Sequence, residues 1–147
     1  MQLSKNFSLE EFIRSETALR HGIDNTPNDE QIEKLRWLAQ QFEDVRALVG
    51  PLHCNSVFRC LEVNRKLGSK DTSQHVKCEA GDLISLAGLT PYQLCKTIVE
   101  SSIAFDQVIY EFSSWMHISF VQSPKIPRRQ VLTINAKYPS GIQGLIL

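Results

Sequence analysis

Residues 108–121 read VIYEFSSWMHISFV, and this stretch decides the fold. Its two arms, 108–112 and 115–121, are rich in β-branched and aromatic residues, which are typical of strands. Ser113 and Ser114 separate the arms and supply the small polar residues of a turn. The stretch therefore predicts a β-hairpin.

Helices are predicted on both sides of the first strands. Apolar residues recur at helical spacing from 32 to 49, and Gly50-Pro51 ends that run. A capping box at 8–11 predicts a short helix that ends near residue 14. A second capping box, at 90–93, opens a helix to about residue 102.

The remaining elements are strands at 52–58 and 80–86, a short helix at 62–67 and an edge strand at 130–134. Helices thus come first, followed mostly by strands with one later helix. This order favours an α+β fold over a doubly wound parallel sheet.

The length of 147 residues fits a single domain, 1–147. Within it we expect a helical part at 1–50, a sheet region at 51–133 and a tail at 134–147. We also expect the protein to be a monomer.

The composition and the first residues of the chain disfavour several kinds of partner and location. Sixteen basic and sixteen acidic residues give a formal net charge of zero, which argues against broad binding to nucleic acid or to an anionic membrane. The first residues, MQLSKNFSLEEF, contain no apolar core of a signal peptide, so we expect synthesis in the cytoplasm without a secretory signal. No apolar run is long enough to span a bilayer. The four cysteines form no C-x-x-C pair, and without an export signal we expect them to be free thiols.

Three side chains form a candidate metal site. His75 ends a polar loop, Asp82 follows seven residues later at the start of a strand, and His117 lies in the second arm of the hairpin. Two histidines and a carboxylate suit zinc, although iron(II) also uses such a set. Cys78 is an alternative sulfur ligand, but Asp82 at the head of a strand has the better claim. No H-E-x-x-H motif is present, which excludes a thermolysin-like helix site.

The residues around these side chains resemble a known family. The segments TSQH (72–75), EAGD (79–82) and WMHIS (115–119) resemble the zinc D-Ala-D-Ala carboxypeptidase family. That family shares its fold with the hedgehog signalling domain and includes VanX-type dipeptidases and phage endolysins. NSVFRCLEVN (55–64) is similar to its S-S-G-Y-R-S-P-x-x-N segment, and FDQVIYEF (105–112) to its F-D-Q-L-I-x-E-F strand.

The resemblance covers about residues 1–133 and implies roles for single residues. It implies zinc as the cofactor, with His75, Asp82 and His117 as ligands. Arg59 matches the arginine that stabilises the oxyanion and contacts substrate. Ser73 matches a serine that helps to place the substrate.

Glu111 is the best candidate for the general base. If Ser113-Ser114 is a two-residue turn, Tyr110 pairs with His117 and Glu111 points to the other face of the sheet. A three-residue loop or a bulge would instead put Glu111 opposite His117. Asp106 is a weaker substitute at the far end of the strand.

The sequence departs from the family pattern at three places, which involve four residues. Val57 stands where the family has glycine, Cys60-Leu61 replaces Ser-Pro, and Cys78 replaces a second glycine. Glycine and proline set the backbone at such positions, so these changes are expected to reshape the substrate groove.

Together these observations predict a hedgehog/DD-peptidase-like fold, with an antiparallel sheet that carries the zinc site and N-terminal helices packed on it. The resemblance implies a zinc peptidase of carboxypeptidase or endopeptidase type that hydrolyses peptidoglycan stem peptides at amides of D-amino acids. It would act on the cell wall after release or as part of a phage virion. Two alternatives stay open: a non-catalytic zinc-binding structural protein of the same fold, such as a virion component, and a metal-free α+β interaction domain.

Overall fold

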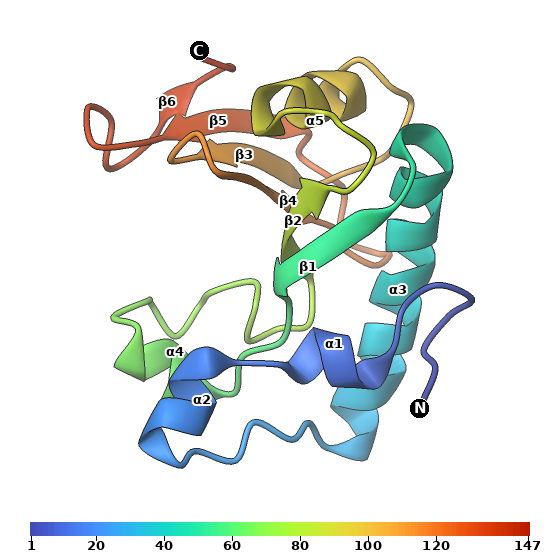
Figure 1. Ribbon diagram of the computed structural model, residues 1–147, viewed down its shortest axis with the longest axis vertical. Helices are drawn as coiled ribbons and strands as arrows, with labels where there is room; N and C mark the ends of the chain where they lie inside the picture. The colour runs from blue at the N-terminus through green and yellow to red at the C-terminus, as the bar shows by residue number, and fades with distance from the viewer. The chain divides into compact units, whose positions relative to one another are not determined.

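The computed structural model describes residues 1–147 and divides into two compact units (Figure 1). The first unit comprises Met1–Glu43 and Ser56–Gly81, and the second comprises Asp44–Asn55 and Asp82–Leu147.

The elements are five helices and six strands, in agreement with the predicted α+β class. The helices are α1 (Leu9–Ile13), α2 (Glu16–His21), α3 (Asp29–Val49), α4 (Leu61–Lys66) and α5 (Pro91–Val99). The strands are β1 (Leu52–Ser56), β2 (Ala80–Ser85), β3 (Gln107–Glu111), β4 (Trp115–Ser119), β5 (Gln130–Ile134) and β6 (Ile142–Gln143). No helix is long and apolar enough to cross a membrane.

The first unit is organised around aromatic side chains. The rings of Phe7, Phe12 and Phe42 contact one another at centroid distances of 5.5–5.9 Å, and all three side chains are buried. The predicted capping box is confirmed, because Ser8 accepts a hydrogen bond from the Glu11 backbone and the Glu11 side chain accepts one from Ser8. The sequence analysis missed α2, whose six residues are too few for a periodic pattern.

The second unit contains most of a six-stranded sheet with the order β1-β2-β4-β3-β5-β6. Strands β3 and β4 form the predicted antiparallel hairpin. β5 pairs with β3 in parallel and with β6 in antiparallel orientation, so the sheet is mixed rather than wholly antiparallel. The predicted edge position of β5 is wrong, because the two-residue strand β6 covers its other side.

The hairpin has a three-residue connection, 112–114, which is one of the two alternatives from the sequence. Glu111 pairs with Trp115, and Ile109 pairs with His117. Since side chains alternate along a strand, Glu111 and His117 lie on one face of the sheet, diagonally rather than directly opposite. The backbone makes this turn with positive φ at two non-glycine residues, Phe112 (φ 51°) and Ser113 (φ 55°).

Helix α5 covers the other face of this hairpin, as Figure 1 shows for the second unit. The Tyr92 ring contacts the Tyr110 ring at 5.6 Å, and Tyr110 alternates with Glu111 along β3. Leu94, Cys95 and Ile98 of α5 are fully buried. The face that carries Glu111 and His117 is therefore the one that α5 does not cover.

Candidate metal centre

His75 lies in the loop between α4 and β2, where its orientation is set by local hydrogen bonds. The His75 backbone N–H donates to Ser73 Oγ at 3.3 Å. Its ring Nδ1 lies 2.7 Å from the carbonyl oxygen of Val57, which accepts only from a protonated nitrogen. This contact selects the tautomer in which Nε2 carries the lone pair for a metal, as in many histidine ligands.

Asp82 and His117 lie on neighbouring strands, β2 and β4. Asp82 Oδ1 and His117 Nδ1 are 3.1 Å apart. Two ligands of a tetrahedral zinc ion are separated by roughly 3.3 Å, so this spacing fits two adjacent ligands as well as a hydrogen bond. Nδ1 is therefore the His117 atom that faces the site.

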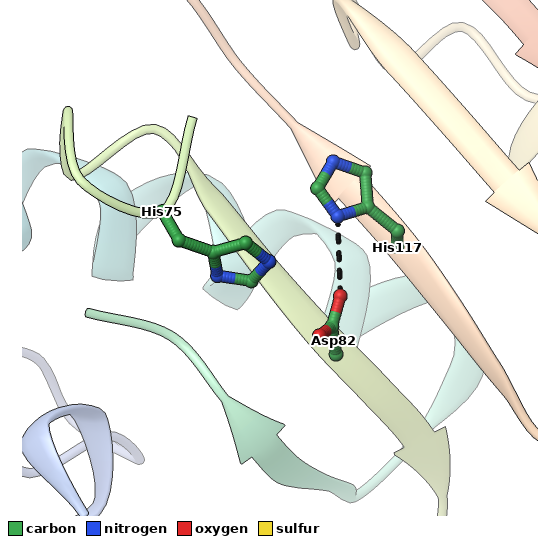
Figure 2. Close-up of side chains that lie close together, drawn as sticks. All are labelled: His75, Asp82 and His117. Atoms are coloured by element: carbon green, nitrogen blue, oxygen red, sulfur yellow. Dashed lines mark hydrogen bonds and ion pairs between the residues drawn. The ribbon is translucent and has the colours of Figure 1, made fainter. Parts of the chain in front are cut away.

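The three predicted ligands come together in the structure (Figure 2). Each offers one donor atom, and these atoms lie within 4.8 Å of one another. His75, Asp82 and His117 are 4%, 6% and 7% exposed. Burial of a carboxylate is costly unless it is paired or bound to a metal, and a divalent cation held by two neutral imidazoles and Asp82 meets that requirement. The donor set therefore fits zinc.

Glu111 lies beside this group. Its Oε1 is 3.9 Å from His117 Nδ1, which is too long for a hydrogen bond but leaves the carboxylate next to the candidate metal ligands. The Glu111 side chain is 18% exposed, compared with 9% for the His117 and Asp82 side chains. Glu111 is thus the more accessible acidic group of the site.

Comparison with known proteins agrees with this geometry. The family model described as Peptidase M15 matches residues 5–119, which is most of the chain and includes all three candidate ligands. The chain belongs to the peptidase M15 family. A comparison with curated proteins gave no match.

Membership in the peptidase M15 family confirms the predicted resemblance and fold class and makes the protein a metallopeptidase. Members of this family depend on zinc, in agreement with the buried His-Asp-His group. The match ends at Ser119, so β5 and β6 lie beyond it.

Arg59 of this peptidase M15 protein lies in the first unit, directly after β1. Its Nη1 donates to Asn64 Oδ1 at 3.3 Å and to Ser69 Oγ at 3.4 Å. Its backbone N–H donates to the His75 carbonyl at 3.3 Å, so the Arg59 backbone is tied to the loop of a candidate ligand.

Asn25 is a positioning residue that the sequence analysis missed. Its Nδ2 donates to the carbonyls of Ile13 (2.8 Å) and Phe58 (3.2 Å), and its Oδ1 accepts from the Cys60 backbone at 2.8 Å. The side chain thus fixes the residues on both sides of Arg59. The only signal in the sequence is Asn25-Thr26-Pro27, a combination of residues that is typical of turns.

Asp106, the weaker candidate base, has a structural role. It accepts a bidentate pair of hydrogen bonds from the Arg128 guanidinium, from Nε to Oδ1 at 3.1 Å and from Nη2 to Oδ2 at 2.8 Å. The Arg128 backbone N–H donates a third hydrogen bond to Oδ1. The hydrogen bond to Asp106 raises the pKa of Arg128. The pair anchors the segment that leads into β5.

The three departures from the family pattern have different structural consequences. Val57 is completely buried and has an ordinary backbone, so no glycine is required there. Cys60 is the N-cap of α4 but makes no capping hydrogen bond. Cys78 has φ 60°, a left-handed conformation that favours glycine.

Cys78 does not belong to the metal group. It is 1% exposed, and burial raises the pKa of its thiol to about 11. A thiol binds metal as the thiolate, so this environment disfavours Cys78 as a ligand. The alternative of sulfur ligation from the sequence therefore has no support in the structure.

Proposed function

We propose that this peptidase M15 protein is a zinc-dependent hydrolase of peptidoglycan stem peptides, with D-amino-acid-containing amides as its substrates. The observation that carries the proposal is Glu111, which lies 3.9 Å from His117 on the face of the hairpin that α5 leaves uncovered. An acidic side chain in this position next to two histidines and an aspartate is what amide hydrolysis requires. The peptidoglycan substrate and a lysin-like role in a phage or prophage rest on the resemblance of the sequence motifs.

Each residue of the candidate site has its own role in the proposed hydrolysis of the amide bond. His75, Asp82 and His117 would hold zinc, which polarises the scissile carbonyl and acidifies a water molecule when it is bound. Glu111 takes a proton from the attacking water and transfers it to the leaving amine as the C–N bond breaks. Arg59 stabilises the negative charge that develops on the carbonyl oxygen.

Ser73 has two compatible roles in this proposal. Its Oγ already accepts from the His75 backbone, which stabilises the ligand loop. The hydroxyl can also donate a hydrogen bond to the substrate, since a serine oxygen both accepts and donates.

The test is release of muropeptides from purified sacculi, followed by mass spectrometry of the products. The wild-type protein loaded with zinc is expected to release peptide fragments, and their masses identify the bond that is cleaved. Glu111→Gln should lower the rate by roughly 100-fold or more while the zinc content stays unchanged. His75→Ala should lose both zinc and activity.

Glu100→Gln is the matched control, because Glu100 is an exposed carboxylate at the end of α5, and it should behave as wild type. If the zinc-loaded wild type releases nothing, the hydrolase proposal is wrong and a non-catalytic zinc-binding protein of this fold takes its place. If Glu111→Gln retains full activity, Glu111 is not the base.

A further inference from the structure

The tip of the β3–β4 hairpin exposes a large aromatic side chain. Phe112 is 51% exposed and has φ 51°, a backbone conformation that is rare for a bulky residue. Two hydrogen bonds maintain it: the Phe112 N–H donates to the Ile134 carbonyl at 2.8 Å, and Ser114 Oγ donates to the Phe112 carbonyl at 2.9 Å. Unfavourable conformations of this kind concentrate at functional sites, where the surrounding contacts enforce them.

Phe112 contacts a second aromatic ring on the face of the candidate site. Its ring centroid is 5.7 Å from that of Trp115, with an interplanar angle of 53°. Trp115 pairs with Glu111 and lies two residues before His117 along β4, so its indole is on the same face as both. The two rings therefore form one aromatic cluster next to Glu111 in the hairpin.

The indole N–H of Trp115 is buried and has no hydrogen-bond acceptor within the protein. A buried tryptophan usually places this group against an acceptor, because an unmade hydrogen bond is costly. Phe112, whose ring contacts this indole, is half exposed and so offers a bound ligand an apolar surface beside the unpaired N–H. An amide carbonyl of a peptide is an acceptor of the required kind.

We propose that Phe112 and Trp115 form a substrate subsite for the peptide residue next to the scissile amide. The rings receive its aliphatic side chain, and Trp115 Nε1 donates to its backbone carbonyl. One apolar surface with a single donor matches a peptide unit, whereas a sugar ring with several hydroxyl groups would require more polar partners. This inference rests on the proposed peptidase function and assigns its specificity to the hairpin tip.

The experiment measures binding apart from catalysis. Glu111→Gln prevents turnover, and Trp37→Phe leaves Trp115 as the single tryptophan of the two in the chain. In this zinc-loaded background, the fluorescence of Trp115 is followed during titration with a synthetic stem pentapeptide that ends in D-Ala-D-Ala. Phe112→Asn, which tolerates a positive φ but lacks the ring, should raise Kd roughly three- to tenfold. Phe112→Tyr should retain the affinity.

Ile126→Asn is the matched control for loss of an exposed apolar side chain, since Ile126 is 84% exposed and distant in sequence from the hairpin; it should leave Kd unchanged. Equal Kd values for Phe112→Asn and its parent, or no binding of the peptide, would overturn the subsite. A dependence on Phe112 that is seen only with a disaccharide-linked peptide would overturn the peptide assignment in favour of the sugar. Because binding is measured without turnover, a failure of the wild type to hydrolyse sacculi contradicts the proposed function alone.

Discussion

At Cys78 the backbone conformation favours one residue type, and the burial of the side chain favours another. Its φ of 60° favours glycine, yet its side chain is buried. The resemblance to the family predicted glycine at this position from sequence, and the backbone conformation supplies the physical reason.

We expect Cys78→Gly to be more stable than Cys78→Ala by about 1 kcal/mol, because alanine keeps the left-handed strain and glycine does not. Both variants lose the buried sulfur atom, and the glycine variant also loses the buried Cβ, so the difference is the backbone gain less the burial of one carbon. Urea unfolding monitored by circular dichroism measures the difference. An alanine variant as stable as the glycine variant would show that the loop relaxes without cost.

The site illustrates what sequence can and cannot predict at this scale. His75, Asp82 and His117 could be proposed as ligands from the sequence because each of them stands in a short local motif. The sequence leaves open on which face of the sheet the Glu111 side chain lies, because this depends on whether Phe112 and Ser113 adopt positive φ. Phenylalanine and serine do not favour positive φ, whereas glycine and asparagine do, so the sequence gives no signal for this turn.

Among the elements, strand β2 begins in close contact with α3. A Cβ atom added at Gly81 would lie 2.7 Å from Cζ and 2.9 Å from Cε2 of Phe42, closer than real contacts allow. Phe42 is fully buried among Phe7 and Phe12, so its ring has little room to move.

Gly81→Ala should therefore lower the free energy of unfolding by about 1–3 kcal/mol and weaken zinc binding, since Asp82 is the next residue. Chemical denaturation and zinc titration measure the two effects. In a double-mutant cycle, Phe42→Leu should cost less stability in the Gly81→Ala background than in wild type. Additive effects would contradict the proposed clash.

Helix α5 carries a buried thiol with a consequence for stability at high pH. Burial raises the pKa of Cys95 from the ordinary 9.0 to about 12. Between these values the unfolded chain loses the thiol proton while the folded chain keeps it. The contribution of Cys95 is therefore complete below about pH 9 and is lost as the pH rises toward 12.

In this window, wild type should lose about 1.4 kcal/mol of unfolding free energy per pH unit more than Cys95→Ala does. Denaturant unfolding at pH 10 and 11, with pH 8 as the reference below the window, measures how fast each variant loses stability. Only the difference between the two slopes matters, because other groups also titrate. Parallel slopes would show that the Cys95 thiol ionises in the folded protein.

The elements themselves were predicted to differing degrees. Capping boxes and periodic apolar residues located α1, α3 and α5, because these signals are local. The neighbours of β5 were not predictable, since its pairing with β3 passes over β4 in the sequence and β6 has only two residues.

At the scale of the whole molecule, metal binding is expected to change global stability. A ligand that binds only the folded state adds roughly 2.7 kcal/mol at 100 times its dissociation constant. The three buried donors have this arrangement only in the folded chain, so zinc should stabilise it.

We expect a chelator to lower Tm and added zinc to restore it, as measured by calorimetry with metal analysis of each sample. His75→Ala and Asp82→Asn should remain folded but lose most of the zinc-dependent shift. His21→Ala is the control, because His21 is an exposed residue at the end of α2. A shift that persists in both ligand variants would place the metal elsewhere.

The three-residue connection between β3 and β4 also limits where the length of this chain can change. A residue added to or removed from 112–114 can be absorbed by the turn, because two- and four-residue connections also join paired strands, so Glu111 keeps its pairing with Trp115. A residue added to or removed from β3 between Ile109 and Glu111 would instead turn Glu111 toward α5 and away from His117. We therefore expect relatives of this protein to vary in the length of this connection, and a one-residue change within the strand to mark the loss of the acidic group from the site.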